Sequence, residues 1–297
     1  MKLSAVVMTW NEERNIKRCL SSLSNLVDEI IVVDMQSSDN TTEIAKTFKA
    51  KIYSHPYIGY VEPARNLGFE KATGDWILVL DADEEVPQTL AKKIKEIISN
   101  DTNTSFYTIP RKTITFNQWI RHGMWWPDYQ IRLFKKGSVE WVNDVHGVPL
   151  TRGTGEDIAP KEEFALVHHN YQTISQYIER FNRYTSIQAR EKIKQKHRFA
   201  WKDLLLRPFE EFLRRYFFSR GYKDGLHGLV LALLQSFSEL VLYLKIWEEE
   251  QFPKTSEEQI KKELEPTVRS MHKQLYHWLK ETEFARGIHL FFQKILS

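Results

Sequence analysis

The first hundred residues alternate short apolar runs with segments whose apolar side chains recur at helical spacing. Continuous apolar runs are typical of strands buried on both faces, and they occur at residues 3–8, 29–33 and 76–80, with a weaker run at 51–54. Helical spacing appears between them, first at Ile16, Cys19, Leu20 and Leu23. Further helices are expected at residues 63–72 and from Pro87 onward, and Asn11 is the expected N-cap of the first helix. The alternation predicts an α/β fold with a parallel sheet covered by helices on both faces.

Polar side chains follow three of these predicted strands. They are Thr9, Asn11 and Glu12 after the first strand, Asp34 after the second, and Asp81 and Asp83 after the fourth. The carboxyl ends of parallel strands meet at one edge of a sheet, where ligands bind. We therefore expect these side chains to converge on a single crevice.

The pattern changes after residue 100. Short strands among turns are expected at residues 105–170, where Trp119, Trp125, Trp126 and Trp141 are concentrated. After residue 173 the chain reads as helical, with a long helix at 174–197, a break near Pro208, an apolar segment at 226–247 and two amphipathic pieces around Pro266. We predict a catalytic domain at 1–172, divided into halves at 1–100 and 101–172, and a helical region at 173–297.

Composition narrows the function classes. The 297 residues carry 42 Lys and Arg against 39 Asp and Glu, a net charge of +3, which argues against a strongly cationic nucleic-acid binder. The single cysteine excludes a disulfide framework. The N-terminal apolar run is too short for a signal peptide, so a cytoplasmic location is expected. Aromatic residues make up 13%, including nine Trp, which suggests a thick core, sugar-stacking surfaces or a membrane-interface belt.

Asp81 and Asp83 are the first candidate functional residues. Two carboxylates two residues apart can hold Mg²⁺ together with substrate phosphates, although Asp83 or Glu84 could instead cap the helix after Pro87. Asp34 could accept hydrogen bonds from a nucleoside or cap a local turn. Arg65 could pair with a diphosphate or be a solvated surface arginine.

Four blocks together carry a family resemblance. They read V-V-M-T-W-N-E-E, I-I-V-V-D-M-Q-S-S-D-N-T, P-A-R-N-L-G-F-E-K-A-T-G-D-W and I-L-V-L-D-A-D-E-E. In this order and spacing they resemble the nucleotide-sugar half of inverting family-two glycosyltransferases, whose GT-A fold is a Rossmann-like, mostly parallel mixed sheet. The later segments M-W-W-P-D-Y-Q-I-R-L-F-K-K-G, W-V-N-D-V-H-G and R-P-F-E-E-F-L-R-R-Y-F-F-S-R-G-Y-K-D-G-L-H-G are similar to the lipopolysaccharide-core glucosyltransferase subgroup.

The resemblance implies roles for particular residues. Nucleotide-sugar binding falls to Thr9, Asn11, Glu12, Asp34, Arg65 and Asp81, and a divalent metal, Mn²⁺ or Mg²⁺, to Asp83 with Asp81. The subgroup has a glutamate after the histidine of V-H-E, where this chain has Gly147, so the general base is open.

An inverting transfer needs a group that takes a proton from the acceptor hydroxyl. Asp128, in the Trp-rich stretch, is the first candidate for that base, and His146 is the second because an imidazole titrates near neutral pH. Arg132 could bind diphosphate or acceptor, or could be a surface residue of a strand.

The C-terminal region raises the question of a membrane. Residues 190–223 hold eleven Lys and Arg against four Asp and Glu, upstream of the apolar segment at 226–247. Peripheral contact with an anionic membrane is one reading, and a helical bundle with a solvated basic face is the other.

The expected function is an inverting, metal-dependent glycosyltransferase. Its donor would be a nucleotide-diphosphate sugar, UDP-linked by preference and carrying glucose or another hexose. Its acceptor would be a glycolipid, lipopolysaccharide or polysaccharide at the cytoplasmic face of the inner membrane. The alternatives are a nucleotidyltransferase, against which there is no glycine-rich phosphate loop followed by Lys, and a catalytically silent sugar-nucleotide-binding protein.

Overall fold

The computed structural model describes residues 1–57, 62–100, 103–142 and 149–281, which form two compact units. The first unit is Met1–Trp119 with Trp126–Gln172, and the second is Ile120–Trp125 with Thr173–Ser297. His146 and Gly147 lie outside the described residues.

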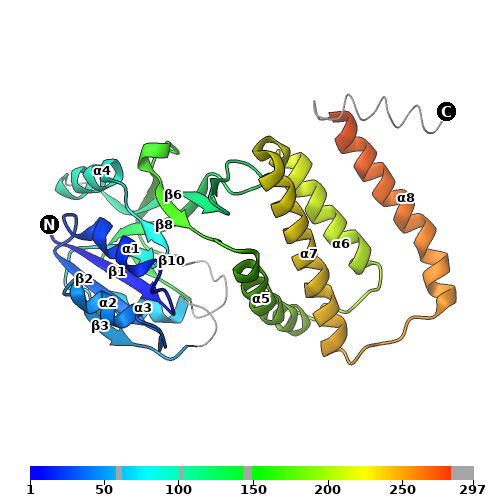
Figure 1. Cartoon of the computed structure of the whole chain (residues 1–297), viewed down its shortest axis with the longest axis horizontal. Coiled ribbons are helices and arrows are strands. Elements are labelled where there is room, and N and C mark those ends of the chain that lie inside the picture. The colour runs from blue at the N-terminus through cyan, green and yellow to red at the C-terminus, as the bar shows by residue number, and fades with distance from the viewer. Residues whose placement is uncertain (58–61, 101–102, 143–148, 282–297) are drawn as a thin grey trace. The chain divides into compact units, whose positions relative to one another are not determined.

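A mixed, mostly parallel sheet forms the centre of the first unit (Figure 1). Its strand order is β3-β2-β1-β4-β8-β6-β12-β5; β7 and β11 also pair with β6, and β9 and β10 form a separate ribbon. β1 to β4 are mutually parallel, whereas β8 enters antiparallel between β4 and β6. The strands are β1 (Leu3–Thr9), β2 (Glu29–Asp34), β3 (Lys51–Ser54), β4 (Trp76–Asp81), β5 (Glu84–Glu85), β6 (Thr104–Thr115), β7 (Gln118–Trp119), β8 (Asp128–Lys135), β9 (Val139–Glu140), β10 (Leu150–Thr151), β11 (Thr154–Asp157) and β12 (Leu166–His169).

Helices cover both faces of this sheet, as the alternating pattern predicted. They are α1 (Ile16–Leu23), α2 (Thr41–Thr47), α3 (Glu62–Lys71) and α4 (Gln88–Ser99), with a short 3-10 turn, η1 (Glu162–Phe164). The buried faces of α1 and α4 pack against Leu3, Ala5 and Val7 of β1. On the opposite face, Phe69 and Ala72 near the end of α3 pack against Val6 and Met8. Because β1 alternates its side chains between two cores, it is buried along its whole length.

The start of α1 differs from the expectation. Asn15, not Asn11, occupies the N-cap position, and Asn11 has a left-handed backbone with φ of +53°. Its side-chain oxygen accepts a hydrogen bond from the Ser38 N–H at 2.8 Å. Asn11 therefore ties the end of β1 to the turn after β2, a use that its tolerance of positive φ permits.

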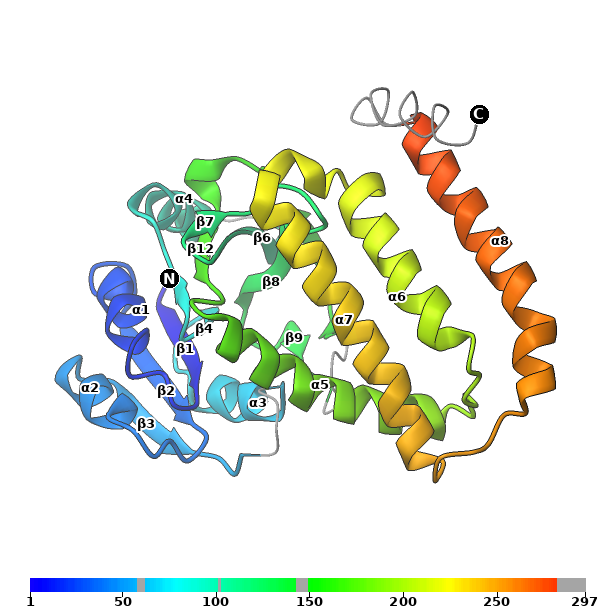
Figure 2. The same cartoon turned by 45° about the vertical axis from the view of Figure 1, so that its right-hand side comes forward.

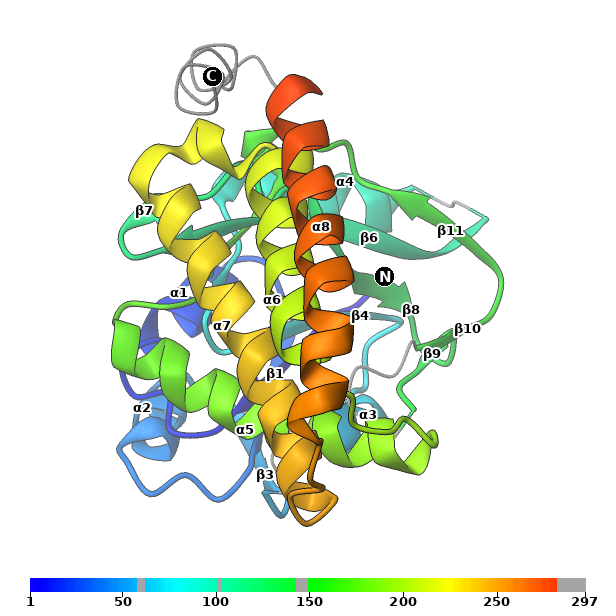
Figure 3. The same ribbon diagram turned by 90° about the vertical axis from the view of Figure 1, so that its right-hand side faces the viewer.

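The second unit is helical. Its elements are α5 (Ile174–Lys194), α6 (Asp203–Leu213), the π-helical turn η2 (Arg214–Phe218), the 3-10 turn η3 (Gly221–Asp224), α7 (Gly225–Glu249) and α8 (Glu257–Glu281). α5 and α6 both pack on α7 (Figure 2), and α8 packs on α6 (Figure 3).

The helix breaks predicted near Pro208 and around Pro266 are wrong. Pro208 lies inside α6 and Pro266 lies inside α8, and both helices continue past the proline. Proline removes one backbone hydrogen bond, but packing on neighbouring helices can outweigh that cost. The chain actually turns at residues 195–202, between α5 and α6.

α7 leaves part of its apolar surface uncovered. Leu226, Leu233, Phe237 and Leu244 recur at steps of seven and four residues and are exposed, whereas Leu242 and Ile246 are buried. Among the described residues, one helical stretch, Gly221–Glu249, is long and apolar enough to cross a membrane, with a mean hydropathy of 1.7 and 28% of that window buried.

Candidate active site

The ends of three parallel strands meet at one edge of the sheet, as predicted. Thr9 is the register partner of Asp34, and Met8 is the partner of Asp81. The Asp34 side chain accepts from the Ser37 N–H at 3.1 Å through Oδ2, and its Oδ1 is buried without a hydrogen-bond partner among the described residues. The Thr9 hydroxyl is likewise buried and unpartnered there. Unpaired buried oxygens are costly, which makes this edge a candidate binding surface.

Glu12 lies just beyond Thr9. Its N–H donates to the Thr41 hydroxyl at 2.8 Å, and its carboxylate accepts from Asn15 at 2.7 Å. Asn11 and Glu12 thus hold the loop between β1 and α1, and they reach the same edge of the sheet as Asp34.

Asp81 is clamped by two buried arginines. Arg65 donates to Oδ1 at 2.8 Å, and Arg132 donates to Oδ2 at 2.6 Å. Burial alone would raise the pKa of the Asp81 carboxyl, but Arg132, Arg65 and Arg111 outweigh it and hold that pKa well below its usual range. Asp81 is therefore a fixed negative charge. The alternative of a surface position for Arg132 or Arg65 is wrong, because both are buried.

Two further ion pairs extend this network toward β8. Arg132 also donates to Glu84 at 2.7 Å, and Glu84 is fully buried on β5. Arg111 of β6 pairs with Glu84 at 3.2 Å and with Asp128. The Nε of Arg111 donates to Asp128 Oδ2 at 2.8 Å, and Gln130 donates to Oδ1 at 2.9 Å.

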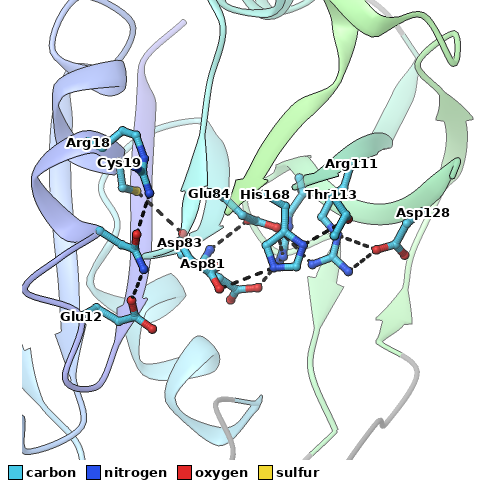
Figure 4. Close-up of polar contacts among 12 residues, drawn as sticks. Glu12, Arg18, Cys19, Asp81, Asp83, Glu84, Arg111, Thr113, Asp128 and His168 are labelled. Atoms are coloured by element: carbon cyan, nitrogen blue, oxygen red, sulfur yellow. Dashed lines mark hydrogen bonds and ion pairs between the residues drawn. The ribbon is translucent and has the colours of Figure 1, made fainter. Parts of the chain in front are cut away.

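Asp83 lies beside a histidine that the sequence pattern did not identify. The Nε2 of His168 is 3.5 Å from Asp83 Oδ2, and its Nδ1 is 3.3 Å from the Thr113 hydroxyl (Figure 4). His168 belongs to β12, opposite Glu84 of β5. The backbone N–H of the next residue, His169, donates to the Asp83 carbonyl at 2.9 Å, which fixes the loop after β4 against β12.

The tryptophans do not share one environment. Trp141 is buried with Phe69 and Phe134, and the Arg65 guanidinium lies 5.1 Å from its ring centre, so this ring belongs to the core rather than to an open sugar platform. Trp119 and Trp126 contact each other edge to face at 5.3 Å and remain half-buried. Trp125 belongs to the helical unit, with Arg215 5.7 Å from its ring.

The first unit thus brings together the predicted residues Thr9, Asp34, Arg65, Asp81, Asp83, Asp128 and Arg132. Sequence reasoning missed Arg111 and His168 and considered Glu84 only as a cap. These residues lie in or beside strands β5, β6 and β12, whose pairing depends on long-range contacts. The pair His168-His169 at the end of an apolar run was a usable signal for β12.

The carboxylate and imidazole side chains at this edge can be compared with the ligands that a divalent cation requires. No group of three or more His, Cys, Asp or Glu side chains in the described part of the chain is placed to enclose a metal ion. A hard divalent cation can nevertheless be held by one or two protein ligands together with substrate phosphates. The Asp83 carboxylate beside the His168 imidazole suits that arrangement, whereas both oxygens of Asp81 are committed to arginines.

Comparison with known proteins finds relatives that are named as glycosyltransferases. A lipopolysaccharide core biosynthesis glycosyltransferase, LpsC, of Rhizobium meliloti is 22% identical over 84% of this chain and 93% of its own length. An uncharacterized glycosyltransferase of Rickettsia typhi is 27% identical over 83% of this chain and 87% of that protein.

A solved structure of glucosyl-3-phosphoglycerate synthase from Mycobacterium tuberculosis, with Mn²⁺ and uridine-diphosphate-glucose, is 23% identical. It covers 37% of this chain and 43% of the synthase, with a TM-score of 0.32. The family model for glycosyl transferase family 2 matches residues 4–152, which is half of the chain. The protein is therefore a glycosyltransferase and belongs to glycosyl transferase family 2.

Proposed function

We propose that this glycosyltransferase moves a hexose from a UDP-linked sugar to a glycolipid or lipopolysaccharide-type acceptor, with inversion and with a divalent cation, Mn²⁺ or Mg²⁺. The observation that carries the proposal is the pair of unpartnered buried oxygens on Thr9 and Asp34, next to the Asp81–Asp83 loop. Acceptors at this edge suit the N–H and hydroxyl groups of a nucleoside.

In this proposal the nucleoside lies over the ends of β1 and β2. Asp34 Oδ1 accepts a hydrogen bond from the base or ribose, and the Thr9 hydroxyl donates or accepts beside it. Trp10, which stacks on Tyr57 with ring centres 4.0 Å apart, bounds the same edge. Asn11 and Glu12 hold the loop that frames the nucleoside.

The diphosphate follows at the end of β4, beside Asp83. A bound divalent cation supplies charge neutralisation for the leaving diphosphate. Asp83 holds that cation. Asp81 keeps Arg65 and Arg132 in place, so their guanidinium N–H groups are fixed beside the proposed diphosphate position without rearrangement during the reaction.

Asp128 is the proposed general base. Arg111 and Gln130 each occupy one of its oxygens, and a carboxylate oxygen has a second lone pair that can accept the acceptor proton. Its side chain is 28% exposed, so a hydroxyl can approach it. His146 remains the alternative base outside the described residues.

A membrane acceptor is supported by the second unit. The exposed side chains Leu226, Leu233, Phe237 and Leu244 give α7 an apolar surface, and the preceding segment is rich in Lys and Arg. We propose that this surface rests on an anionic membrane at the cytoplasmic face, in the manner of an interfacial helix.

Binding and hydrolysis of the sugar donor test the proposed reaction. Thermal unfolding is measured with a panel of nucleotide sugars and Mn²⁺, because a ligand that binds the native state raises Tm. UDP-sugar hydrolysis is then followed for wild type and for Asp83→Ala, with Glu140→Ala, an exposed strand residue, as control. We expect a Tm increase with UDP-sugars and metal-dependent hydrolysis that Asp83→Ala abolishes. Stabilisation by nucleoside triphosphates alone, with pyrophosphate release, would contradict the proposal.

Membrane contact has its own test. Liposomes with and without anionic lipid are floated with an active preparation at low salt. We expect binding to anionic vesicles that falls in Leu233→Ser/Phe237→Ser protein, and Glu258→Ala, an exposed change on α8, serves as control. Absence of the wild-type protein from the floated fraction would refute this part of the proposal.

A further inference from the structure

Three strongly exposed apolar side chains lie at one corner of the helical unit, where α6 ends and α7 begins (Figure 2). Met124, Phe218 and Leu226 are 53%, 63% and 72% exposed, and these three residues are called the corner below. They come from the loop Ile120–Trp125, from the end of η2 and from the start of α7. Single exposed apolar side chains are common on soluble proteins, whereas several gathered at one place mark a contact surface.

Hydrogen bonds hold the three segments of the corner together. The N–H of Gly123 donates to the Ser219 carbonyl at 2.8 Å, so the loop Ile120–Trp125 is fixed to the residue that follows η2. The carboxylate of Asp224, directly before α7, accepts from the His122 N–H at 2.7 Å. The loop is thus tied to both of the other segments, and the apolar side chains of the corner project from one connected structure.

The charges of the chain around the corner are mainly positive. Residues 212–238 contain four Lys and Arg and a single acidic residue, Asp224. Asp224 is buried, whereas Arg220 and Lys223 are exposed. Solvent therefore meets apolar side chains and cations from this segment, without an exposed carboxylate. This combination matches an anionic lipid surface, because the apolar groups enter the lipid and the cations pair with its phosphates.

The two ends of α7 differ in this respect. At its last turn Glu248 is exposed, and Arg190 is paired with Glu249 at 3.2 Å, so carboxylates face solvent there. At the corner, the Trp278 ring lies 5.5 Å from that of Phe218. Tryptophan is enriched where an apolar phase meets water, whereas carboxylates are repelled by anionic lipid. The start of α7 is therefore the end that suits a membrane.

We propose that the corner inserts into the headgroup layer of a membrane that contains anionic lipid. Its three apolar side chains reach the boundary with the acyl chains, and Arg220 and Lys223 bind lipid phosphates beside them. The inference rests on the membrane contact of the proposed function. It deepens that contact by giving it a point of insertion at the start of α7, rather than along the length of the helix.

Insertion at the corner also brings lipid close to the proposed general base. Met124 precedes Asp128 by four residues, so chain length alone keeps their Cα atoms within about 14 Å of each other. An acceptor sugar carried on a lipid headgroup then meets the enzyme near the side chain that is proposed to take its proton. The corner thus favours an acceptor that is held in a membrane.

Vesicle binding measures the role of the corner. Vesicles of phosphatidylcholine, with and without phosphatidylglycerol, are titrated into wild type, Met124→Ser/Phe218→Ser and Arg220→Gln/Lys223→Gln protein. The matched control is Val268→Ser, which replaces a 51% exposed apolar side chain on α8. Circular dichroism and Tm identify any variant that is not folded.

The depth of insertion is measured with a fluorophore attached to Phe218→Cys protein and quenched by lipids that are spin-labelled along the acyl chain. The native Cys19 is buried, and burial raises the pKa of its thiol, so it reacts slowly with the label. Labelled Val268→Cys is the control. Leu226→Ser serves in vesicle binding if the double serine variant does not fold.

We expect Met124→Ser/Phe218→Ser to weaken binding to anionic vesicles at least about tenfold, because two apolar side chains no longer leave water on binding. Arg220→Gln/Lys223→Gln should weaken it by about 25-fold, at roughly fivefold for each charge removed. Val268→Ser should remain within about twofold of wild type. Spin-labelled lipid should quench the label at position 218 and leave the label at position 268 unchanged.

Three results would overturn the inference in distinguishable ways. If Met124→Ser/Phe218→Ser binds vesicles as wild type does while Leu233→Ser/Phe237→Ser does not, the side of α7 makes the membrane contact without the corner. If the corner variants change the oligomeric state measured by light scattering but not vesicle binding, the surface fits a second copy of this chain. If folded wild type binds no anionic vesicles, the membrane contact of the proposed function fails as well.

Discussion

The guanidinium of Arg132 donates from one nitrogen to both Asp81 and Glu84, at 2.6 Å and 2.7 Å. Arg132 is 2% exposed, so its charge is neutralised by these buried carboxylates rather than by water. Removing the positive charge of Arg132 would leave the buried carboxylates of Asp81 and Glu84 without that opposite charge.

Replacement of Arg132 should therefore destabilise the first unit. We expect Arg132→Met to lower the free energy of unfolding by about 3–5 kcal/mol, because it leaves Glu84 and Asp81 with fewer donors. Urea denaturation followed by circular dichroism measures the change, and Arg152→Met, at an exposed position in the same unit, is the control. A loss no larger than that of the control would contradict a structural role for the Arg132 ion pairs.

Asp128→Asn should affect turnover more than folding. Asparagine keeps an oxygen for Arg111 but cannot take the acceptor proton, so we expect kcat to fall by about 10²–10⁴-fold with donor and acceptor both saturating. Initial rates and Tm are measured together, with Gln130→Ala as control for the loss of a neighbouring hydrogen bond. Near-wild-type turnover of Asp128→Asn would move the base assignment away from Asp128.

The lowered pKa of the Glu29 carboxyl predicts how the free energy of unfolding depends on pH. Burial would raise the pKa of its carboxyl, but hydrogen bonds from Lys51, Ser4 and Thr73 dominate and lower that pKa from 4.5 to about 2. Its stabilising contribution is fully present above pH 4.5 and is lost as the pH falls from 4.5 through 2, because the unfolded chain takes up the proton first.

This contribution is on the order of 3 kcal/mol, because each unit of pKa difference between the folded and unfolded chain is worth about 1.4 kcal/mol. Glu29→Gln should therefore flatten the decline of unfolding free energy between pH 4.5 and pH 2, measured by denaturant titration at each pH. Glu140→Gln, at an exposed position, should leave the curve as in wild type. If the unfolding free energies of wild type and Glu29→Gln fall in parallel between pH 4.5 and pH 2, the hydrogen bonds to Glu29 do not lower the pKa of its carboxyl.

The close approach of α7 to η3 depends on a glycine. A Cβ at Gly228 would lie 1.8 Å from the Gly221 carbonyl oxygen, so the backbone would have to move. Gly228→Ala should destabilise the helical unit by about 1–3 kcal/mol, which is the usual range for overpacking. Hydrogen exchange of α7 reports the change, and Ser238→Ala on the same helix should not increase exchange.

Asp224 fixes the segment Ile120–Trp125 within the helical unit. Its carboxylate accepts from the N–H groups of Arg121 and His122 at 3.1 Å and 2.7 Å, and from the His122 ring at 3.0 Å. Asp224→Ala should release this segment and speed trypsin cleavage after Arg121, and Glu258→Ala is the control. Equal cleavage rates for Asp224→Ala and wild type would show that other contacts hold the segment.

The parallel half of the sheet follows from local sequence pattern. The apolar runs of β1, β2 and β4 and the helical spacing of Ile16 to Leu23 are set by short-range periodicity, and the structure confirms them. The convergence of Asp34 and Asp81 followed from the same pattern, because parallel strands end at one edge. Helix continuity through Pro208 did not follow, because packing between helices outweighed the local preference of proline.

The sequence by itself determined the fold class, the polar strand ends and the resemblance to family-two glycosyltransferases, since each is encoded within a few neighbouring residues. Only the tertiary structure decided the partners of those strand ends. Arg132 reaches Asp81 from 51 residues away, and His168 reaches Asp83 from β12. Such pairings depend on strand order and register in the mixed half of the sheet, where long loops bring distant segments together and local periodicity carries no information about which strands become neighbours.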